Sequence, residues 1–472
     1  MDAAAMAIQA GQPECAVELL EQGRGVLLAR QLEAHGGRAL LRERAPELAG
    51  QLADLDHALR APALARPISE DNQPGRAGPP SSPADQRIRL AQERDLVMTQ
   101  IRARADLAEL VSPPRFSRLQ AAAVRGPVVI VNVSTYRCDA LIVQASTVTT
   151  MPLPGVTAES VAEQADTLIS ATDNAQRRTV AEVLEWLWDR IVGPVLTSLG
   201  LTSRPQPGQR FPHLWWCPTG LAAFLPLHAA GHYPATTPVP NTALDLVISS
   251  YTPTLRTLIQ LRERTTDPIT PDHGPLIVAM PQTPGAAPLN DAEQEAEDLA
   301  RRFPACQRLD GATATHAAVT ATLPNHPWAH FSCHGVQDLN DPSRSGLQLH
   351  DQRLTIQQIS NLELSGTEFA YLSACDTYRT SPGIPDEGIT LASALQLAGY
   401  QHVIATLWQI SGLTASDLAR RFYDLIARNS NGATIIDVSA SAEALRAAVS
   451  ALREESPTIP PFDLVAYIHT GP

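Results

Sequence analysis

Short apolar runs alternate with helical stretches along the second half of the chain, and this alternation restricts the fold more than any other feature. Runs with the length and composition of buried strands cover residues 276–280, 328–333, 369–374 and 402–407. Helical patterns lie between them, near residues 291–303, 315–322 and 388–398. Strands that alternate with helices form a parallel sheet whose faces are covered by the helices. The pattern therefore predicts an α/β domain.

An earlier stretch of the chain has the same character. It contains strand-like runs at 128–133, 140–143, 214–218 and 246–251 and a helical pattern at 180–192. A break rich in Pro and Asp near residues 267–275 separates it from the later stretch. We therefore predict two α/β halves of similar size, covering residues 127–270 and 271–472, although no sequence repeat relates them.

The first 60 residues are rich in Ala, Leu, Glu and Arg and carry apolar residues at helical spacing. The segment Gly11-Gln12-Pro13-Glu14 divides them into a short helix and a longer one. Two helices joined by a tight turn resemble the end of a tetratricopeptide array, although about three repeats are normally needed for stability. Either the helices dock on the rest of the chain or the chain is the end of a longer protein. The alternative to a tetratricopeptide-like unit is an ordinary helical hairpin. A Pro-rich linker at 61–87 and a helical connector at 88–126 follow.

Composition excludes several classes of protein. The net charge of −13 argues against nucleic acid or an acidic membrane surface as a partner. No run of about 18 apolar residues is present, and the N-terminus lacks the basic segment of a secretory signal. The six cysteines are scattered without a C-x-x-C pair, which argues against a disulfide scaffold or zinc site and fits a reducing cytoplasm. Because nucleotide-binding motifs are also absent, we predict a cytoplasmic protein without a cofactor, metal or membrane segment.

A histidine and a cysteine follow two of the predicted strands in the second half. His334 comes directly after the run at 328–333, and Cys375 comes directly after the run at 369–374. Ligands and chemistry collect at the carboxyl ends of the strands in an open parallel sheet. An imidazole placed there can accept the thiol proton, and the resulting thiolate is a nucleophile. The backbone N–H of Gly335, together with that of Cys375, is a candidate oxyanion hole.

Each of these residues has a simpler interpretation when taken alone. A single histidine is more often structural, and a single cysteine is more often a small buried hydrophobe. Cys333 precedes His334 on the strand and faces the opposite side, so we assign it to the core. A metal site of Cys333, His334 and Cys375 lacks an evident fourth ligand. His228, in the first half, is predicted to be structural.

The segments around the two candidate residues resemble the CHAT domain, a caspase-like family of cysteine peptidases (clan CD) often found after tetratricopeptide repeats. The resemblance spans residues 127–472. The matching segments are 278–281, 329–335, 345–349, 372–377, 386–388, 397–400 and 403–408 in the second half, and 215–220 and 225–231 in the first. It implies a caspase-like parallel-sheet sandwich after tetratricopeptide-like helices, with a pseudo-caspase half at 127–270 and a catalytic half at 271–472. It also implies a cysteine endopeptidase with His334 as base and Cys375 as nucleophile.

Relatives in the wider caspase-like group cleave after one particular residue, and several prefer a basic one. A basic side chain needs a carboxylate in its pocket, and Asp376, Asp386 and Glu387 are the candidates. The alternative for each is a solvated loop acid or a helix N-terminal charge. Many members of the family carry a run of acidic residues after the segment that ends here at Trp408. In this chain residues 409–417 contain only one acid.

We therefore predict an endopeptidase that cleaves a specific protein substrate under regulation, with bacterial defence or programmed cell death as its setting. A regulatory protein or ligand is expected to act through the helical N-terminus. The alternative is a catalytically silent caspase-like scaffold that binds protein partners. A thioester hydrolase using the same two residues is a weaker alternative. The segment 378–385 is a candidate site of self-cleavage.

Overall fold

The computed structural model describes residues 1–24, 41, 44–60, 83–104, 114–233, 242–264, 274–338, 341–362, 364, 366–374, 390–430, 433–456 and 459–472. It divides into two compact units. The larger unit contains Met1–Ala29 and Arg115–Pro472, and the smaller contains Arg30–Pro114. The predicted segment boundaries at 60, 87 and 126 do not coincide with this division and stay predictions.

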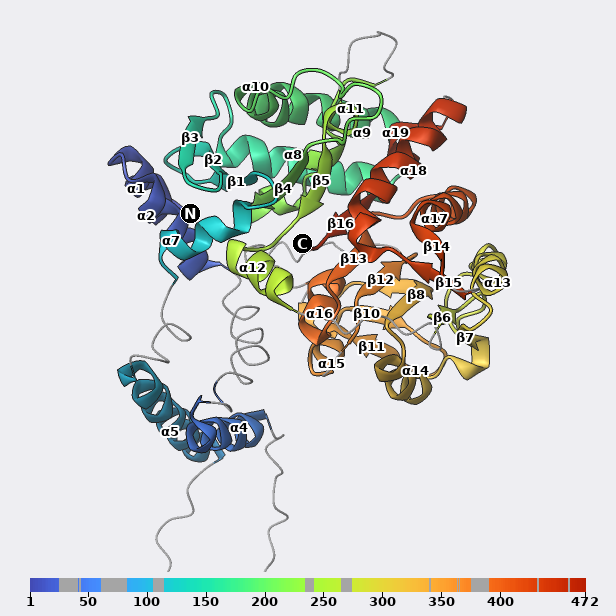
Figure 1. The fold of residues 1–472 in the computed structure, drawn as a ribbon, viewed down its shortest axis with the longest axis horizontal. Coiled ribbons are helices and arrows are strands. Elements are labelled where there is room, and N and C mark those ends of the chain that lie inside the picture. The colour runs from blue at the N-terminus through green and yellow to red at the C-terminus, as the bar shows by residue number, and fades with distance from the viewer. Residues whose placement is uncertain are drawn as a thin grey trace, which may run out of the picture. The chain divides into compact units, whose positions relative to one another are not determined.

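The larger unit is built on an 11-stranded sheet with the strand order β3-β2-β1-β4-β5-β16-β13-β12-β8-β6-β7 (Figure 1). Most neighbouring strands are parallel, and β1 with β2, β2 with β3 and β13 with β16 are antiparallel. The predicted α/β class with a mostly parallel sheet is therefore confirmed. The strands of this sheet are β1 (Val128–Val133), β2 (Cys138–Val143), β3 (Val148–Pro152), β4 (His213–Pro218), β5 (Ile248–Tyr251), β6 (Leu276–Ala279), β7 (Gln307–Asp310), β8 (Trp328–Ser332), β12 (Phe369–Leu372), β13 (His402–Thr406) and β16 (Tyr467–Thr470).

Helices cover both faces of the sheet. Capping boxes at Thr157, Thr355 and Thr390 start three of them by satisfying backbone N–H groups that have no partner within the helix. The helices of the larger unit are α1 (Asp2–Gln9), α2 (Pro13–Gly23), α7 (Phe116–Leu119), α8 (Ala158–Asp173), α9 (Arg177–Leu187), α10 (Gly193–Ser198), α11 (Ala243–Leu246), α12 (Leu255–Glu263), α13 (Ala292–Arg302), α14 (His316–Thr322), α15 (Ile356–Ser360), α16 (Leu391–Ala398), α17 (Gly412–Ile426), α18 (Ser441–Glu455) and α19 (Pro461–Leu464). Two small antiparallel sheets complete it, one of β9 (His334–Val336), β10 (Gly346–Gln348) and β11 (Arg353–Thr355), and one of β14 (Ala427–Ser430) and β15 (Ala433–Ile436).

The strand β16 joins the two predicted halves into one sheet. It pairs with β5 in parallel and with β13 in antiparallel orientation. The strands β5 and β13 therefore run in opposite directions, and the carboxyl ends of the two sets of parallel strands lie at opposite edges of the sheet. Cys217, at the end of β4, and His228 consequently belong to the other edge from His334. This arrangement leaves the second half to supply the candidate site on its own.

The hydrogen bonds of His228 agree with the prediction that it is structural. Its Nδ1 lies 2.9 Å from the hydroxyl of Tyr251 in β5, and its Nε2 lies 3.0 Å from the carbonyl oxygen of Val465, just before β16. Burial lowers the pKa of His228 to about 4. The imidazole therefore bridges the two halves in its neutral form.

The N-terminal helices α1 and α2 pack against one face of the sheet in the first half. Val17 and Leu20 are buried there in one cluster with Trp215 and Leu255. The buried carboxylate of Glu21 accepts hydrogen bonds from the backbone N–H groups of residues 255 and 256, at distances of 2.7 and 3.2 Å, and so caps the start of α12. The structure therefore shows α1 and α2 docked on the first half of the sheet.

The smaller unit contains α4 (Pro46–Arg60) and α5 (Pro83–Ala103). They pack through a small cluster that includes Leu41, Val97 and Ile101. Whether this pair or α1 and α2 is related to tetratricopeptide repeats stays a prediction. Within the described ranges, no helix has the length and apolar character needed to cross a membrane.

Candidate active site

The carboxyl ends of β6, β8 and β12 lie side by side in the second half. Phe331 in β8 is paired with Leu372 in β12, and the N–H of Ser373 donates to the carbonyl of Phe331 at 2.8 Å. On the other side of β8, the N–H of Met280 donates to the carbonyl of Ser332 at 2.8 Å. The strands that precede the two candidate catalytic residues therefore end level with each other.

His334 is the first residue of β9 and is partly exposed. Its Nε2 lies 2.7 Å from the carbonyl oxygen of Ala287, in the loop after β6. A carbonyl oxygen can only accept a hydrogen bond, so Nε2 carries the hydrogen in this contact. In a neutral ring Nδ1 is then the nitrogen that can accept a proton. The neighbouring Gly335 is paired with Leu347 of β10.

The remaining predicted site residues, Cys375, Asp376, Asp386 and Glu387, lie outside the described residues. The last described residue before Cys375 is Ala374, which is buried and accepts a hydrogen bond through its carbonyl from the hydroxyl of Thr406 at the end of β13. The structure thus places His334, Gly335 and the strand that leads to Cys375. The dyad, the oxyanion hole and the three candidate pocket acids stay predictions.

A pocket of about 220 Å³ opens at the same strand ends. Ser332, Ser373 and Ala374 form part of its wall. The first turns of α13 and α17, the loop 288–291, residues 408–410 and single residues of β13 and β16 also line it. Cys333 also lines it, although this cysteine is buried in the core as predicted. Two carboxylates line the pocket, those of Asp291 and Glu295, and no Arg or Lys does so among the described residues. The pocket is therefore acidic.

Glu295 lies beneath the strand ends and is only 5% exposed. Its Oε2 accepts hydrogen bonds from the hydroxyls of Ser332, at 2.8 Å, and Ser373, at 3.1 Å. Its Oε1 lies 3.4 Å from Nε2 of the buried His330, which hydrogen-bonds through Nδ1 to the hydroxyl of Tyr423 at 3.1 Å. The two hydroxyl donors on Oε2 lower the cost of burying this carboxylate.

Asp291 precedes α13 and meets the first residue of α17. A Cβ atom added to Gly412 would lie 2.1 Å from Oδ2 of Asp291. The carboxylate therefore occupies the space that a side chain at position 412 would need. Gly412 lies in the stretch 409–417 after Trp408, which contains one acid. The single acid of this stretch, Asp417, does not line the pocket.

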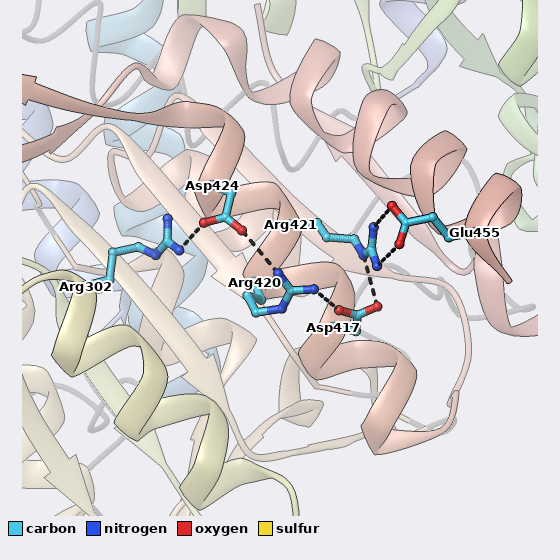
Figure 2. A network of polar contacts seen from close by, with 6 residues as sticks. All are labelled: Arg302, Asp417, Arg420, Arg421, Asp424 and Glu455. Atoms are coloured by element: carbon cyan, nitrogen blue, oxygen red, sulfur yellow. Dashed lines mark hydrogen bonds and ion pairs between the residues drawn. The ribbon is translucent and has the colours of Figure 1, made fainter.

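Asp417 belongs instead to a network of ion pairs that fixes α17 (Figure 2). It pairs with Arg420 and, at 3.0 Å, with Arg421 on the same helix. Burial acts to raise the pKa of Asp417, but hydrogen bonds from the two arginines outweigh it and hold that pKa below its ordinary value. Arg421 also makes a two-pronged contact of 2.9 and 2.8 Å with Glu455 of α18.

The other end of this network reaches α13. Arg420 pairs at 3.4 Å with Asp424, which also pairs with Arg302 of α13 (Figure 2). The helix whose first turn lines the pocket is thereby tied on both sides. Ion pairs of this kind, exposed to solvent, are individually weak, so their joint effect is to orient α17 more than to stabilise the fold.

Sequence patterns did not identify Asp291 and Glu295 as pocket residues. They are four residues apart at the start of a predicted helix, which places them on one face. Acids are common in the first turn of any helix because they favour its positive end. Only the packing of α13 against the ends of β8 and β12 distinguishes these two from ordinary helix-start acids.

Comparison with known proteins agrees with the fold. The CHAT domain family matches residues 181–472, more than half of the chain. The separase of the Saccharomyces cerevisiae separase–securin complex is similar in structure, with a TM-score of 0.50 and 10% sequence identity over 83% of this chain and 34% of the separase chain. This chain thus spans about a third of that relative, and the likeness concerns the fold alone.

Two gingipain structures are more distant. The complex of the Porphyromonas gingivalis RgpB pro- and mature domains has a TM-score of 0.40 and 10% identity over 73% of this chain and 78% of that chain. The Arg-specific cysteine proteinase gingipain R (RgpB) has a TM-score of 0.39 and 10% identity over 62% and 67%. No curated protein matches the sequence. The match to more than half of its length shows that the chain belongs to the CHAT domain family, whose structural neighbours here are clan CD cysteine proteases.

Proposed function

We propose that this chain is a cysteine endopeptidase in which Cys375 is the nucleophile and His334 is the general base. One observation carries the proposal. His334 follows Phe331 by three residues, Cys375 follows Leu372 by three residues, and Phe331 and Leu372 are paired in adjacent parallel strands. Adjacent strands lie only about 4.8 Å apart, so the two residues start from the same level of the sheet.

The chemistry follows from the contact of His334 with Ala287. Because Nε2 donates to that carbonyl, Nδ1 accepts the proton of the Cys375 thiol, and the thiolate attacks the peptide carbonyl. The backbone N–H groups of Gly335 and Cys375 stabilise the oxyanion. The protonated imidazole then gives its proton to the leaving amine. Water hydrolyses the thioester, with His334 again as base.

The acidic pocket supports a substrate with a basic residue before the cleaved bond. Ala374, the neighbour of Cys375, lines this pocket together with Asp291 and Glu295. A guanidinium or ammonium group there gains charge-assisted hydrogen bonds, whereas an acidic side chain meets two like charges. We include in the proposal that the substrate is a specific protein. The small separate unit of α4 and α5 supports a further role for the helical N-terminal region in binding a regulatory protein.

A map of new protein N-termini tests the proposal. Purified wild-type protein and the Cys375→Ala and His334→Ala variants are each added to a cell lysate. We expect new termini with wild type alone, preceded by Arg or Lys. Cys138→Ala is the matched control, because it removes a buried thiol that does not line the pocket and should leave the map unchanged. If wild type and Cys375→Ala give the same map, and an iodoacetamide probe does not label Cys375, the protein is a scaffold.

A further inference from the structure

One buried carboxylate links the two strands that lead to the candidate dyad. Ser332 precedes His334 by two residues, and Ser373 precedes Cys375 by two residues. The hydroxyls of both serines donate to the same oxygen, Oε2 of Glu295, at 2.8 and 3.1 Å. Glu295 comes from α13, which is part of neither strand. A third element therefore joins the two strand ends.

We propose that Glu295 is a positioning residue that sets the spacing of His334 and Cys375 by holding Ser332 and Ser373 on one carboxylate oxygen. This inference rests on the proposed function, because it assigns Glu295 a part in the geometry of that dyad. Glu295 touches neither reacting group in this role and acts through the two serines.

The backbone pairing of β8 with β12 does not extend as far as the candidate dyad. The paired register of β8 and β12 ends at Phe331 and Leu372. Beyond that level, the described backbone contact between the two strands is the bond from the N–H of Ser373 to Phe331. After Ser332 the chain turns away into β9, which pairs with β10 in a different sheet. His334 thus lies beyond the paired part of the two strands. A misplacement of about 1 Å between reacting groups can cost roughly 100-fold in rate.

The surroundings of Glu295 fix the carboxylate itself. Its second oxygen lies 3.4 Å from Nε2 of His330, which is fully buried. The ring of His330 stacks on Tyr371, with centroids 5.1 Å apart, and bonds to the hydroxyl of Tyr423. A hydrophobic residue at 295 would leave the two serine hydroxyls without this acceptor. The two serine hydroxyls give Oε2 of Glu295 donors from two different strands, which is what a spacer between those strands requires.

Four variants of the full chain separate this role from others. Glu295→Ala removes the acceptor, and Glu295→Gln keeps an acceptor oxygen of the same shape. Ser332→Ala/Ser373→Ala removes both donors and leaves the pocket carboxylate in place. Glu297→Gln changes an exposed acid of the same helix and is the matched control. The readouts are the iodoacetamide alkylation rate of Cys375 between pH 5.5 and 9, measured by peptide mass spectrometry, and the exchange rate of the Ser373 amide hydrogen.

We expect Glu295→Ala and the double serine variant to lose the imidazole-activated thiol. Alkylation at pH 6 should fall roughly tenfold, because an unpaired thiol has a far smaller thiolate fraction and only part of this is offset by its higher nucleophilicity. The pH dependence of Cys375 alkylation should become that of an ordinary cysteine. The backbone amide hydrogen of Ser373 should exchange at least about tenfold faster than in wild type. Glu297→Gln should behave like wild type. Glu295→Gln removes a charge from the pocket but keeps an acceptor oxygen for the serines, so its alkylation pH profile and its Ser373 amide exchange should stay close to those of wild type. Combining Glu295→Ala with the double serine change should add nothing.

Three results would overturn the inference. Faster exchange with an unchanged pH profile would show that Glu295 is only structural. A defect in Glu295→Ala and Glu295→Gln that the double serine variant lacks would show that the carboxylate acts in the pocket and not through the serines. Additive effects would also exclude a shared contact. His334→Ala distinguishes the proposed function: if that variant alkylates like wild type, the dyad itself is absent. If it is impaired and Glu295→Ala is not, only the positioning role is wrong.

Discussion

Replacing Gly412 by Ala tests whether the carboxylate of Asp291 contributes to substrate binding. The added Cβ would lie 2.1 Å from Oδ2 of Asp291, and ordinary contact requires more than about 3 Å. Gly412 lies at the start of α17, where its backbone is fixed, and Asp291 is a short side chain at the pocket edge. The carboxylate must therefore retreat by about 1 Å.

Coulomb's law gives the size of the effect. A unit charge about 4 Å from the carboxylate gains roughly 4 kcal/mol at an effective dielectric constant of 20, and about 0.8 kcal/mol of this is lost when the separation grows to about 5 Å. The Gly412→Ala variant should therefore cleave a substrate with Arg before the bond about fourfold more slowly in kcat/KM. Asp291→Asn removes a charge-assisted hydrogen bond worth about 1.5–3 kcal/mol, so its loss should be roughly 10- to 100-fold.

The assay compares kcat/KM for two peptides that differ only in Arg or Gln before the cleaved bond, with sequences taken from the N-terminal map. Both variants should lower the Arg:Gln ratio and leave kcat/KM for the Gln peptide nearly unchanged. The combined Asp291→Asn/Gly412→Ala variant should equal Asp291→Asn, because both changes act on one charge. If Gly412→Ala lowers cleavage of both peptides equally, the change acts on α17 or the dyad, and the reasoning fails.

Three further predictions concern the scaffold. Between pH 7 and pH 5 wild type should lose about 2 kcal/mol more unfolding free energy than His228→Asn, because burial lowers the pKa of His228 to about 4 and the unfolded state has about 6.5. The stabilisation from neutral His228 is present above the pKa that this histidine has in the unfolded state, and it is lost as the pH falls. If urea titrations show that wild type and His228→Asn lose the same unfolding free energy, the reasoning is wrong. Leu20→Ala should cost about 2–5 kcal/mol, whereas Leu413→Ala, at 74% exposed, should cost less than about 0.5 kcal/mol. If both cost the same, α2 is not part of the core. Glu455→Gln should leave peptide cleavage unchanged, since the paired carboxylate is exposed; a marked loss would show that orientation of α17 depends on this one contact.

The sequence predicted the strands of the second half well because their signal is local. The runs ending at 333, 374 and 407 correspond to β8, β12 and β13, which end one or two residues earlier. A buried strand in a parallel sheet is apolar on both faces, so its pattern does not depend on its partners. The first two runs are followed in the sequence by His334 and by Cys375-Asp376-Thr377. The edge that carries His334 could therefore also be predicted.

The joining of the halves could not be predicted in this way. The strand β16 is four residues long and is paired with strands more than 60 and more than 200 residues earlier in the sequence. Nothing in Tyr467–Thr470 indicates that it inserts between β5 and β13. The pocket could not be predicted either, because Asp291 and Glu295 become pocket residues only through the non-local packing of α13.

The carboxylate that makes the pocket acidic can come from more than one position in the sequence. The stretch after Trp408 contains one acid, Asp417, and that acid does not line the pocket. In the structure, Asp291 places its carboxylate against Gly412 of that same stretch. An acid at position 412 and an acid at position 291 therefore compete for one space, and the fold has room for only one of them. Asp291→Ala should lower the Arg:Gln ratio about as much as Asp291→Asn does, and Asp291→Ala/Gly412→Asp should restore most of it, since a carboxylate returns to the same wall of the pocket. If the double variant does not prefer Arg over Gln, the direction from which the carboxylate approaches matters as much as its charge, and the two positions are not equivalent.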